Sequence, residues 1–356
     1  MSTHDRSTNV ASSNDSPRPV LDVRELRKYF PLSSGIFNKR AGTVHAVDDI
    51  SFSVMAGETL GIVGESGCGK STTARLLMRL IEPDAGRVLL DGRGIAEPAP
   101  HGLAIGEVRR QMQMVFQDSF ASLNPRLTIE DSIAFGPVVH GLPRRQAKAR
   151  ARELLARVGL APERYAARYP HELSGGQRQR INIARALALE PRIVILDEAV
   201  SALDKSVEAQ VLNLLLDLKR EFGLTYLFIS HDLNVVRYMS DRVMVMYLGK
   251  IAEIGPVEAI FGGTAHPYTK ALLSAMPSMD PARRTQKPPL TGDPPSPIDP
   301  PPGCRFRTRC LYAEDVCARL DPQLVIAGSP DHRVACEILR PASGHSLAAP
   351  AIAHAA

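Results

Sequence analysis

Short apolar runs alternate with helical patterns from Val20 to about Pro256. The runs at residues 59–63, 192–196 and 225–230 have the length and apolar content of buried strands. Strands that alternate with helices are typical of a parallel sheet covered by helices. We therefore predict an α/β domain over residues 20–256.

The pattern changes between residues 119 and 185, where strands stop and charged helical stretches such as residues 144–158 take over. We interpret this part as a helical subdomain inserted into the α/β domain. The polar residues 1–19 contain Ser, Asn, Asp and Pro and are predicted to form a disordered tail.

A smaller region follows the α/β domain and is predicted to form an extension over residues 257–340. It begins with a short helical segment near residues 268–275 and continues into residues 276–303, where ten prolines favour an extended crossing. The Ala-rich residues 341–356 are predicted to be a frayed tail.

Composition narrows the class of protein. The chain has 356 residues, of which 44% are hydrophobic, 23% charged and 5% aromatic, as in ordinary globular proteins. No apolar run approaches the roughly 18 residues of a membrane span, and the N-terminus lacks the apolar stretch of a signal peptide. The net charge of +5 is too small to indicate nucleic-acid binding. We expect a cytoplasmic protein whose membrane role comes through partners.

A glycine-rich loop follows the apolar run at residues 59–63. Residues 64–71 read GESGCGKS, which matches G-x-x-x-x-G-K-[ST] between a strand and a helix predicted at residues 71–80. In this pattern backbone N–H groups face phosphate oxygens, the lysine reaches the β and γ phosphates, and the serine hydroxyl binds Mg²⁺. The predicted nucleotide-binding residues are Gly64, Glu65, Ser66, Gly67, Cys68, Gly69, Lys70, Ser71 and Thr72.

Cys68 has two interpretations. It is either a small residue that fills the loop or a thiol whose pKa is lowered at the helix N-terminus, which would make it sensitive to oxidation or alkylation.

Two carboxylates end the apolar strand at residues 192–196. Asp197 is suited to the second shell of the Mg²⁺ held by Ser71, and Glu198 is then free to orient and deprotonate a water molecule. A second glycine-rich sequence, Leu173, Ser174, Gly175, Gly176 and Gln177, opens a helix predicted at residues 178–189. Ser174 is predicted to cap this helix, whose exposed backbone donors form a second anion site.

Together these motifs resemble the ATP-binding subunits of ABC transporters, and the resemblance extends from about residue 20 to residue 255. It implies that the segment Leu173–Gln177 of one subunit closes over ATP held by the phosphate loop of another. By position, it makes Gln117 a residue that touches Mg²⁺ or water and His231 the switch histidine at the γ phosphate. The magnesium ligands implied are Ser71, Gln117 and Asp197, and the catalytic residues are Glu198, His231, Lys70 and Gln117.

The resemblance also assigns a loop that joins the two half-sites and an aromatic residue that stacks on adenine. The loop comprises Ser201, Ala202, Leu203 and Asp204. Phe30 is the first choice for the adenine contact and Tyr29 the second. One departure from the family pattern is Ala199, where a proline commonly follows the glutamate; every reacting group is present, so we expect hydrolysis.

The region around residues 265–273 and the cysteines beyond it resemble the extension of ATPases from di- and oligopeptide importers and their nickel and glutathione relatives. This segment contains four cysteines: Cys304, Cys310, Cys317 and Cys336. Arg305, Arg307 and Arg309 lie between the first two, and cationic neighbours favour thiolates. The resemblance favours a [4Fe–4S] cluster, while zinc and free thiols or a disulfide stay open.

The leading hypothesis is therefore an ATPase subunit that energises uptake of short peptides at the cytoplasmic face of the inner membrane. The implied partners are a second, different ATPase subunit, two membrane-spanning permeases and an extracytoplasmic binding protein, with no nucleic acid. Nickel, glutathione or another solute is the alternative cargo. A soluble ABC ATPase of DNA repair or translation is the alternative class, but the chain has neither two cassettes nor a long coiled-coil insertion. A third hypothesis is a regulatory module whose cysteine region senses redox state.

Overall fold

The computed structural model describes residues 18–34, 39–95, 102–276, 292 and 295–349. The tail predicted at residues 1–19 and the crossing predicted at residues 276–303 lie largely outside the described residues, as do residues 350–356.

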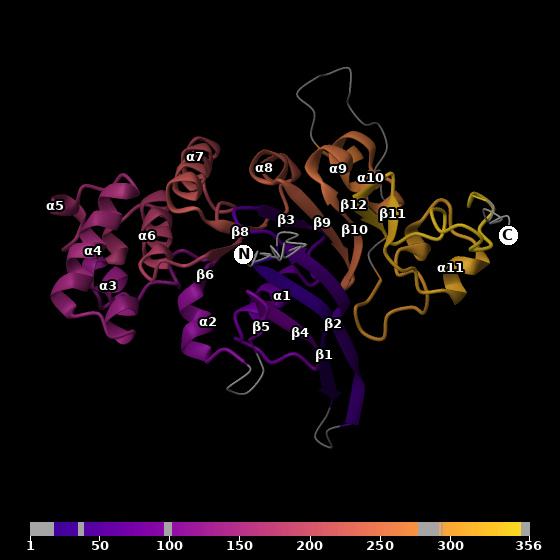
Figure 1. Ribbon diagram of the computed structural model, residues 1–356, viewed down its shortest axis with the longest axis horizontal. Coiled ribbons are helices and arrows are strands. Elements are labelled where there is room, and N and C mark those ends of the chain that lie inside the picture. Colours follow the sequence, from indigo (N-terminus) through magenta and orange to yellow (C-terminus); the bar gives the residue numbers. More distant parts are fainter. Residues whose placement is uncertain (1–17, 35–38, 96–101, 277–291, 293–294, 350–356) are drawn as a thin grey trace, which may run out of the picture.

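A mixed sheet of eight strands forms the centre of the molecule, in the order β11-β12-β10-β9-β3-β8-β7-β6 (Figure 1). The strands from β9 to β6 are parallel, which agrees with the prediction, whereas β10, β12 and β11 add an antiparallel edge that was not predicted. The strands are β3 (Thr59–Val63), β6 (Met112–Val115), β7 (Ile193–Asp197), β8 (Thr225–Ile229), β9 (Arg242–Tyr247), β10 (Lys250–Pro256), β11 (Val325–Ala327) and β12 (Ser329–Val334).

A second, antiparallel sheet has the order β2-β1-β4-β5. Its strands are β1 (Leu21–Ser34), β2 (Lys39–Val54), β4 (Ala85–Leu90) and β5 (Arg93–Gly94). The pairing of β1 with β2 contains several register shifts, and that of β1 with β4 contains one, so the strands lack an unbroken alternation of apolar and polar residues. For this reason the sequence pattern did not separate this sheet from the parallel one.

The pleat of the central strands divides their side chains between two hydrophobic cores. In β7, Ile193 and Ile195 belong to the core that contains the antiparallel sheet and helix α1 (Lys70–Leu77). Val194 and Leu196 belong to the other core, which contains helices α7 (Lys205–Phe222) and α8 (Leu233–Met239) and continues into the helical subdomain. All residues of β3, β7 and β8 are buried, as expected for a parallel sheet covered on both faces.

Helices cover both faces of the sheet and form the helical subdomain at one end of the molecule (Figure 1). The helices of the α/β domain are α1 (Lys70–Leu77), α2 (Ile105–Gln111), α7 (Lys205–Phe222) and α8 (Leu233–Met239). Those of the helical subdomain are α3 (Ile129–Val139), α4 (Arg144–Arg157), α5 (Pro162–Tyr165) and α6 (Gly175–Leu187), with a 3₁₀ turn at Pro170–Glu172. The helices predicted at 71–80 and 178–189 therefore begin and end one to three residues earlier.

The C-terminal extension joins the central sheet directly, because β12 pairs with β10. Its helices are α9 (Val257–Gly263), α10 (Pro267–Ser274) and α11 (Asp315–Arg319), with a 3₁₀ turn at Arg307–Arg309. The frayed tail was predicted to begin at residue 341, but residues 341–349 are held in place. The His345 ring lies 2.8 Å from the Tyr312 carbonyl, and the Ser346 N–H donates to Glu314.

No helix among the described residues combines the length and the apolar character that a membrane crossing requires.

A buried carboxylate fastens the extension to the sheet. Glu253 of β10 is fully buried and accepts hydrogen bonds from the Thr264 hydroxyl at 2.6 Å and the Ala265 N–H at 2.9 Å. Its Oε1 lies 2.7 Å from Nε2 of His332 on β12. His266 is also buried, and its Nδ1 accepts the Tyr268 N–H at 3.0 Å at the start of α10. Burial lowers the pKa of His266 to about 4, partly opposed by the negative charge of Glu253.

This arrangement predicts a loss of stability in mild acid. Between its ordinary pKa of 6.5 and about 4, His266 binds a proton in the unfolded chain and not in the folded one. The free energy of unfolding therefore falls as the pH decreases through this interval, by at most about 1.4 kcal/mol per pH unit from this group. His266→Asn keeps an acceptor for the Tyr268 N–H and removes the titration, so denaturant unfolding should depend less steeply on pH. The exposed His140→Asn serves as the control, and equal slopes in wild type and His266→Asn would contradict the prediction.

Candidate nucleotide site

The phosphate loop connects β3 to α1, and its conformation requires glycine. Gly64 and Gly69 have φ angles of 151° and 109°, in the region that side chains rarely adopt. A Cβ atom would lie 2.2 Å from the Met246 carbonyl oxygen at Gly64 and 2.3 Å from the Ala46 carbonyl oxygen at Gly69. The loop is therefore packed against neighbouring backbone, and a side chain at either position would clash with it.

Lys70 lies across this loop with its side chain buried. Its Nζ donates to the carbonyl oxygens of Gly64 at 2.8 Å and Glu65 at 3.1 Å. The ammonium group is thus fixed over the loop, and none of the described carboxylates forms an ion pair with it that would cancel its charge for an incoming phosphate.

Cys68 lies inside the same loop and is buried. Burial raises the pKa of its thiol, although Lys70 acts in the opposite direction. The hypothesis of a reactive thiol with a lowered pKa is therefore wrong, because desolvation outweighs the nearby positive charge. Cys68 fills space between the loop and the core.

The carboxyl ends of four neighbouring parallel strands bring the other predicted residues together. Ser71 follows β3 in the chain, Gln117 follows β6, Asp197 and Glu198 end β7, and His231 follows β8. Because these strands are adjacent in the sheet, their polar ends meet at one edge.

Asp197 and Glu198 take different partners. The Ser71 hydroxyl donates to Asp197 at 3.0 Å, and burial raises the pKa of this carboxyl. Glu198 Oε2 accepts a hydrogen bond from Gln117 Nε2 at 3.0 Å and lies 3.4 Å from Nδ1 of His231. The φ angle of Glu198 is 49°, so the chain leaves the strand pleat here and turns this carboxylate toward the two side chains.

The second glycine-rich sequence caps helix α6 as predicted. The Ser174 side chain accepts the Gln177 N–H at 3.4 Å, and the Gln177 side chain accepts the Ser174 N–H at 3.1 Å. A Cβ atom on Gly176 would lie 2.5 Å from the Val207 side chain, so this glycine lets α6 approach α7. Leu173 is buried in the core of the helical subdomain.

The segment after Glu198 is a tight turn into α7. The Ser201 hydroxyl donates to the Glu198 carbonyl at 3.0 Å, and Leu203 N–H donates to the Val200 carbonyl. Ala199 is buried in this turn. Alanine leaves the preceding Glu198 free of the restriction that proline places on the residue before it.

The two aromatic candidates on β1 differ in their surroundings. The Tyr29 ring stacks on His45 with 4.3 Å between centroids, and its hydroxyl donates to Asp48. Phe30 has 37% of its surface exposed, and Lys28 lies over its ring, 5.5 Å from the centroid. Phe30 is therefore the aromatic residue that has a face available for a base.

Two side chains of the extension also contact the phosphate loop, and the sequence interpretation missed both. Tyr268 and Arg309 bind Glu65, from which they are separated by 203 and 244 residues. No local pattern signals contacts at such separations.

The four C-terminal cysteines line one small cavity together with His266 and His345. Burial raises the pKa of Cys304 to about 12 and that of Cys336 to about 11. Of the three arginines expected to favour thiolates, Arg305 binds Asp48 and Arg309 binds Glu65, whereas Arg307 donates to the Pro302 carbonyl and also lines the cavity. That expectation was wrong, because burial raises the pKa of the thiols. Among the described residues, no group of three or more Cys, His, Asp or Glu has the arrangement of a metal site.

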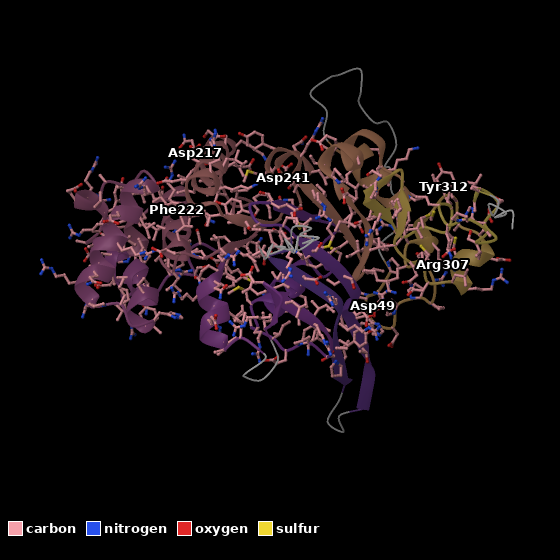
Figure 2. All side chains as sticks on the ribbon, viewed as in Figure 1. Asp49, Asp217, Phe222, Asp241, Arg307 and Tyr312 are labelled. Atoms are coloured by element: carbon pink, nitrogen blue, oxygen red, sulfur yellow. The ribbon has the colours of Figure 1, made fainter. Side chains whose placement is uncertain are left out.

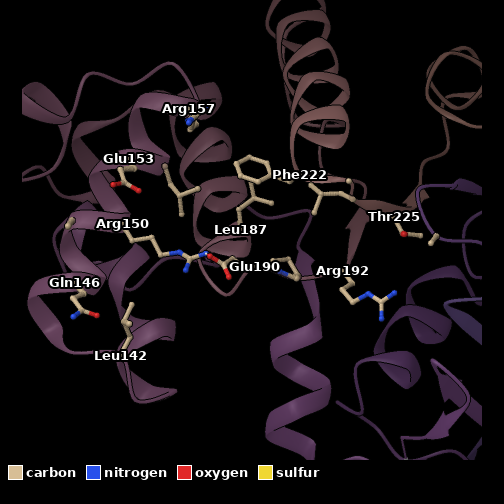
Figure 3. A pocket seen from close by; sticks show the side chains of 16 residues that line it. Leu142, Gln146, Arg150, Glu153, Arg157, Leu187, Glu190, Arg192, Phe222 and Thr225 are labelled. Carbon is tan, nitrogen blue, oxygen red and sulfur yellow. The ribbon is translucent and has the colours of Figure 1, made fainter.

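A much larger cavity, about 790 Å³, lies between the helical subdomain and the α/β domain (Figure 3). It is lined by residues such as Arg150, Leu187 and Phe222, and by Arg192 and Thr225 at the amino ends of β7 and β8. These strand ends are at the sheet edge opposite the phosphate loop. The cavity is therefore separate from the nucleotide site.

Comparison with protein families gives two matches. Residues 47–201 match the family described as "ABC transporter", and residues 252–317 match "Oligopeptide/dipeptide transporter, C-terminal region".

Comparison with individual proteins gives relatives along most of the chain. A probable peptide ABC transporter ATP-binding protein of Sinorhizobium fredii is 53% identical over 340 residues, 94% of each chain. The oligopeptide transport ATP-binding protein AppF of Bacillus subtilis is 51% identical and covers 90% of this chain and 97% of its own. A glutathione import ATP-binding protein of Shigella boydii is 56% identical over 79% of this chain but only 45% of its own. Among solved structures, the dimeric ATP-binding cassette MJ0796 with ADP and phosphate has a TM-score of 0.56 and 27% identity, covering 67% of this chain and 98% of that one.

Proposed function

Because this chain belongs to the ATP-binding subunits of the oligopeptide and dipeptide ABC transporter family, we propose that it hydrolyses ATP to drive import of short peptides. The observation that carries the proposal is the meeting of Ser71, Gln117, Asp197, Glu198 and His231 at one sheet edge beside the phosphate loop. The family model of the C-terminal region favours a peptide cargo.

The phosphate loop binds the nucleotide through its backbone N–H groups and the Lys70 ammonium group. Phe30 stacks on the adenine, and Thr72 lies in the first turn of α1 behind the loop. The Ser71 hydroxyl and the Asp197 carboxylate are oxygen donors of the kind that Mg²⁺ prefers, and they lie within hydrogen-bond distance of each other. Bound there with Gln117, Mg²⁺ would neutralise charge on the β and γ phosphates.

Glu198 acts as the general base. Its carboxylate orients a water molecule for attack on the γ phosphate and accepts a proton from it. Gln117 and His231 both contact Oε2 of Glu198, so they hold this carboxylate in one orientation. His231 contacts the γ phosphate from the end of β8.

Hydrolysis is completed by a second ATPase subunit, which we propose is a different chain. The capped N-terminus of α6 presents Ser174, Gly175 and Gly176 to ATP held by that subunit, and Ser201–Asp204 join the two half-sites. Bound ATP bridges the subunits, and hydrolysis removes the bridge. The free energy of ATP binding and hydrolysis is therefore used for a conformational change.

Helix α3 supplies the surface for the permeases. Phe135, Val138 and Val139 occupy positions i, i+3 and i+4 of this helix and are 62%, 40% and 65% exposed. Such a stripe of apolar side chains on one helix face fits a helix or loop of a membrane-embedded partner. The protein would then sit on the cytoplasmic face of the membrane, with cargo chosen by the permeases and an extracytoplasmic binding protein.

The cysteine cavity is the proposed site of a [4Fe–4S] cluster. All four cysteines line one cavity, and four cysteine ligands are what such a cluster requires. Because no three of them are arranged as a metal site among the described residues, a cluster would have to draw the thiols closer together. Their raised pKa values mean that binding would release protons to solvent. A bound cluster would cross-link residues 304–336 into one unit.

Nucleotide chemistry is tested with Glu198→Gln and Lys70→Ala. With the partner ATPase subunit present, we expect Glu198→Gln to bind ATP normally, to hydrolyse it at least about 100-fold more slowly and to accumulate the ATP-bound dimer, because the amide cannot accept the proton. Lys70→Ala should lose ATP binding. Phosphate release measures the hydrolysis rate of each variant, and size-exclusion chromatography with ATP measures the ATP-bound dimer. Hydrolysis by Glu198→Gln at the normal rate would refute its assigned role.

Transport is tested in cells whose sole copy of this protein carries Glu198→Gln. Uptake of labelled di- and oligopeptides should fall to background, since no ATP is turned over. Phe135→Asp should also abolish uptake while leaving ATP binding by the purified protein intact, because its side chain lies outside the core. If peptide uptake persists while uptake of glutathione or nickel is lost, the cargo is that solute.

The cluster is tested by chemical analysis of anaerobically purified protein. We expect about four iron and four sulfide per chain, in keeping with a [4Fe–4S] cluster. Cys304→Ser should lower both, and Cys68→Ser, whose thiol lies in the phosphate loop, should not. About one zinc per chain would assign zinc instead, and the absence of all three would leave free thiols.

A further inference from the structure

Two contacts tie the phosphate loop to the C-terminal extension. The Glu65 N–H donates to the Tyr268 hydroxyl at 3.0 Å, and Arg309 Nη1 donates to Glu65 Oε2 at 2.8 Å. Tyr268 is fully buried and the Arg309 side chain is only 6% exposed. Both ends of Glu65, its backbone and its carboxylate, are therefore held by residues outside the α/β domain.

The position of Glu65 matters because its carbonyl oxygen holds Lys70. Lys70 Nζ donates to this oxygen at 3.1 Å, and Cys68 N–H donates to it at 3.2 Å. A displacement of Glu65 therefore moves the ammonium group and the turn of the loop together.

The carboxylate of Glu65 also creates an electrostatic problem. It is a negative charge within a loop whose task is to bind a triphosphate, and like charges at close range oppose binding. Arg309 pairs with this carboxylate and cancels its charge. The Arg309 side chain is 6% exposed and that of Glu65 23%, so the pair is partly shielded from solvent.

A second arginine of the same segment reaches the adenine end of the site. Arg305 donates to Asp48 and to the Leu248 carbonyl, and Asp48 accepts the hydroxyl of Tyr29, which precedes Phe30. The Gly249 N–H donates to the Cys68 carbonyl at 2.9 Å, so the turn held by Arg305 also touches the phosphate loop. Arg309 thus contacts the phosphate loop directly, and Arg305 is connected to the adenine end through Asp48 and Tyr29.

From these contacts we propose that Arg309 is a positioning residue for ATP: it holds Glu65, neutralises its carboxylate and so makes nucleotide affinity depend on the cysteine-bearing extension. This inference rests on the proposed ATPase function, because it concerns the same phosphate loop. Arg309 touches neither substrate nor reacting atoms, so its effect should fall on binding and spare the chemical step.

The test compares Arg309→Gln with Arg307→Gln. Arg307 belongs to the same 3₁₀ turn, but its guanidinium binds the Pro302 carbonyl, and it lies on the extension at the end of the molecule opposite the helical subdomain (Figure 2). We expect Arg309→Gln to raise the Kd of a fluorescent ATP analogue and the KM for ATP about tenfold, with kcat changed by less than about twofold. Arg307→Gln should leave all three unchanged. A tenfold change corresponds to about 1.4 kcal/mol.

Two further variants separate positioning from general loss of structure. Glu65→Gln combined with Arg309→Gln removes both charges, so it should bind ATP more tightly than Arg309→Gln alone. Arg309→Lys should recover part of the affinity because it keeps the positive charge.

The outcomes are distinct. An unchanged Kd in Arg309→Gln, an equal rise in Arg307→Gln or the absence of any recovery in the double variant would overturn the inference. All rates are measured with the partner ATPase subunit present. If the wild-type protein neither binds nor hydrolyses ATP under that condition, the proposed function fails, and this result differs from any difference between the variants.

Discussion

The pairing of parallel strands β3, β8, β7 and β6 sets the position of every group at the nucleotide edge. In this ladder Ile62 pairs with Ile229, and Ile229 pairs in turn with Asp197. The ladder continues one residue further, since the Glu198 N–H donates to the Ile229 carbonyl even though Glu198 has left the strand conformation. A shift of one residue in register would exchange side chains between the two cores. It would also separate the buried Tyr226 hydroxyl from the Leu215 carbonyl, leaving buried polar groups unpaired.

Carboxylates near the nucleotide site are stabilised by hydrogen bonds and ion pairs rather than by exposure to solvent. Asp197 is buried beside Glu198, and burial and the neighbouring carboxylate both raise its pKa. The Ser71 hydroxyl opposes this shift, and a divalent cation at the same place would oppose it more strongly. Glu65 and Asp48 are negative charges near the phosphates and the adenine, and they pair with Arg309 and Arg305 of the extension. Lys250 of the α/β domain also lies 3.9 Å from Asp48. The extension therefore adds counter-charges at both ends of the site.

Sequence reasoning identified those features that are determined by neighbouring residues. The glycines of the phosphate loop, the cap at Ser174 and the strands ending at Asp197 and near Ser230 depend on residues a few positions apart, so their pattern is visible along the chain. The partners of Tyr29, Arg305 and Arg309 depend on contacts between remote segments, and no local signal exists for them. Cys68 illustrates the same limit. Its place at a helix N-terminus predicts a lowered pKa, whereas its burial, which only the fold determines, raises it.

The two sides of the junction between the helical subdomain and the α/β domain are built differently. On the nucleotide side, α6 packs into a core continuous with the sheet, and Gly176 allows close contact with α7. On the opposite side lies the 790 Å³ cavity, spanned by the ion pair of Arg157 with Glu221 and bordered by that of Arg150 with Glu190. Ion pairs between exposed side chains contribute about 0–1 kcal/mol, far less than a packed core. The subdomain therefore makes its extensive packed contacts with the α/β domain on the nucleotide side, whereas the ion pairs at the cavity on the other side add little to its attachment.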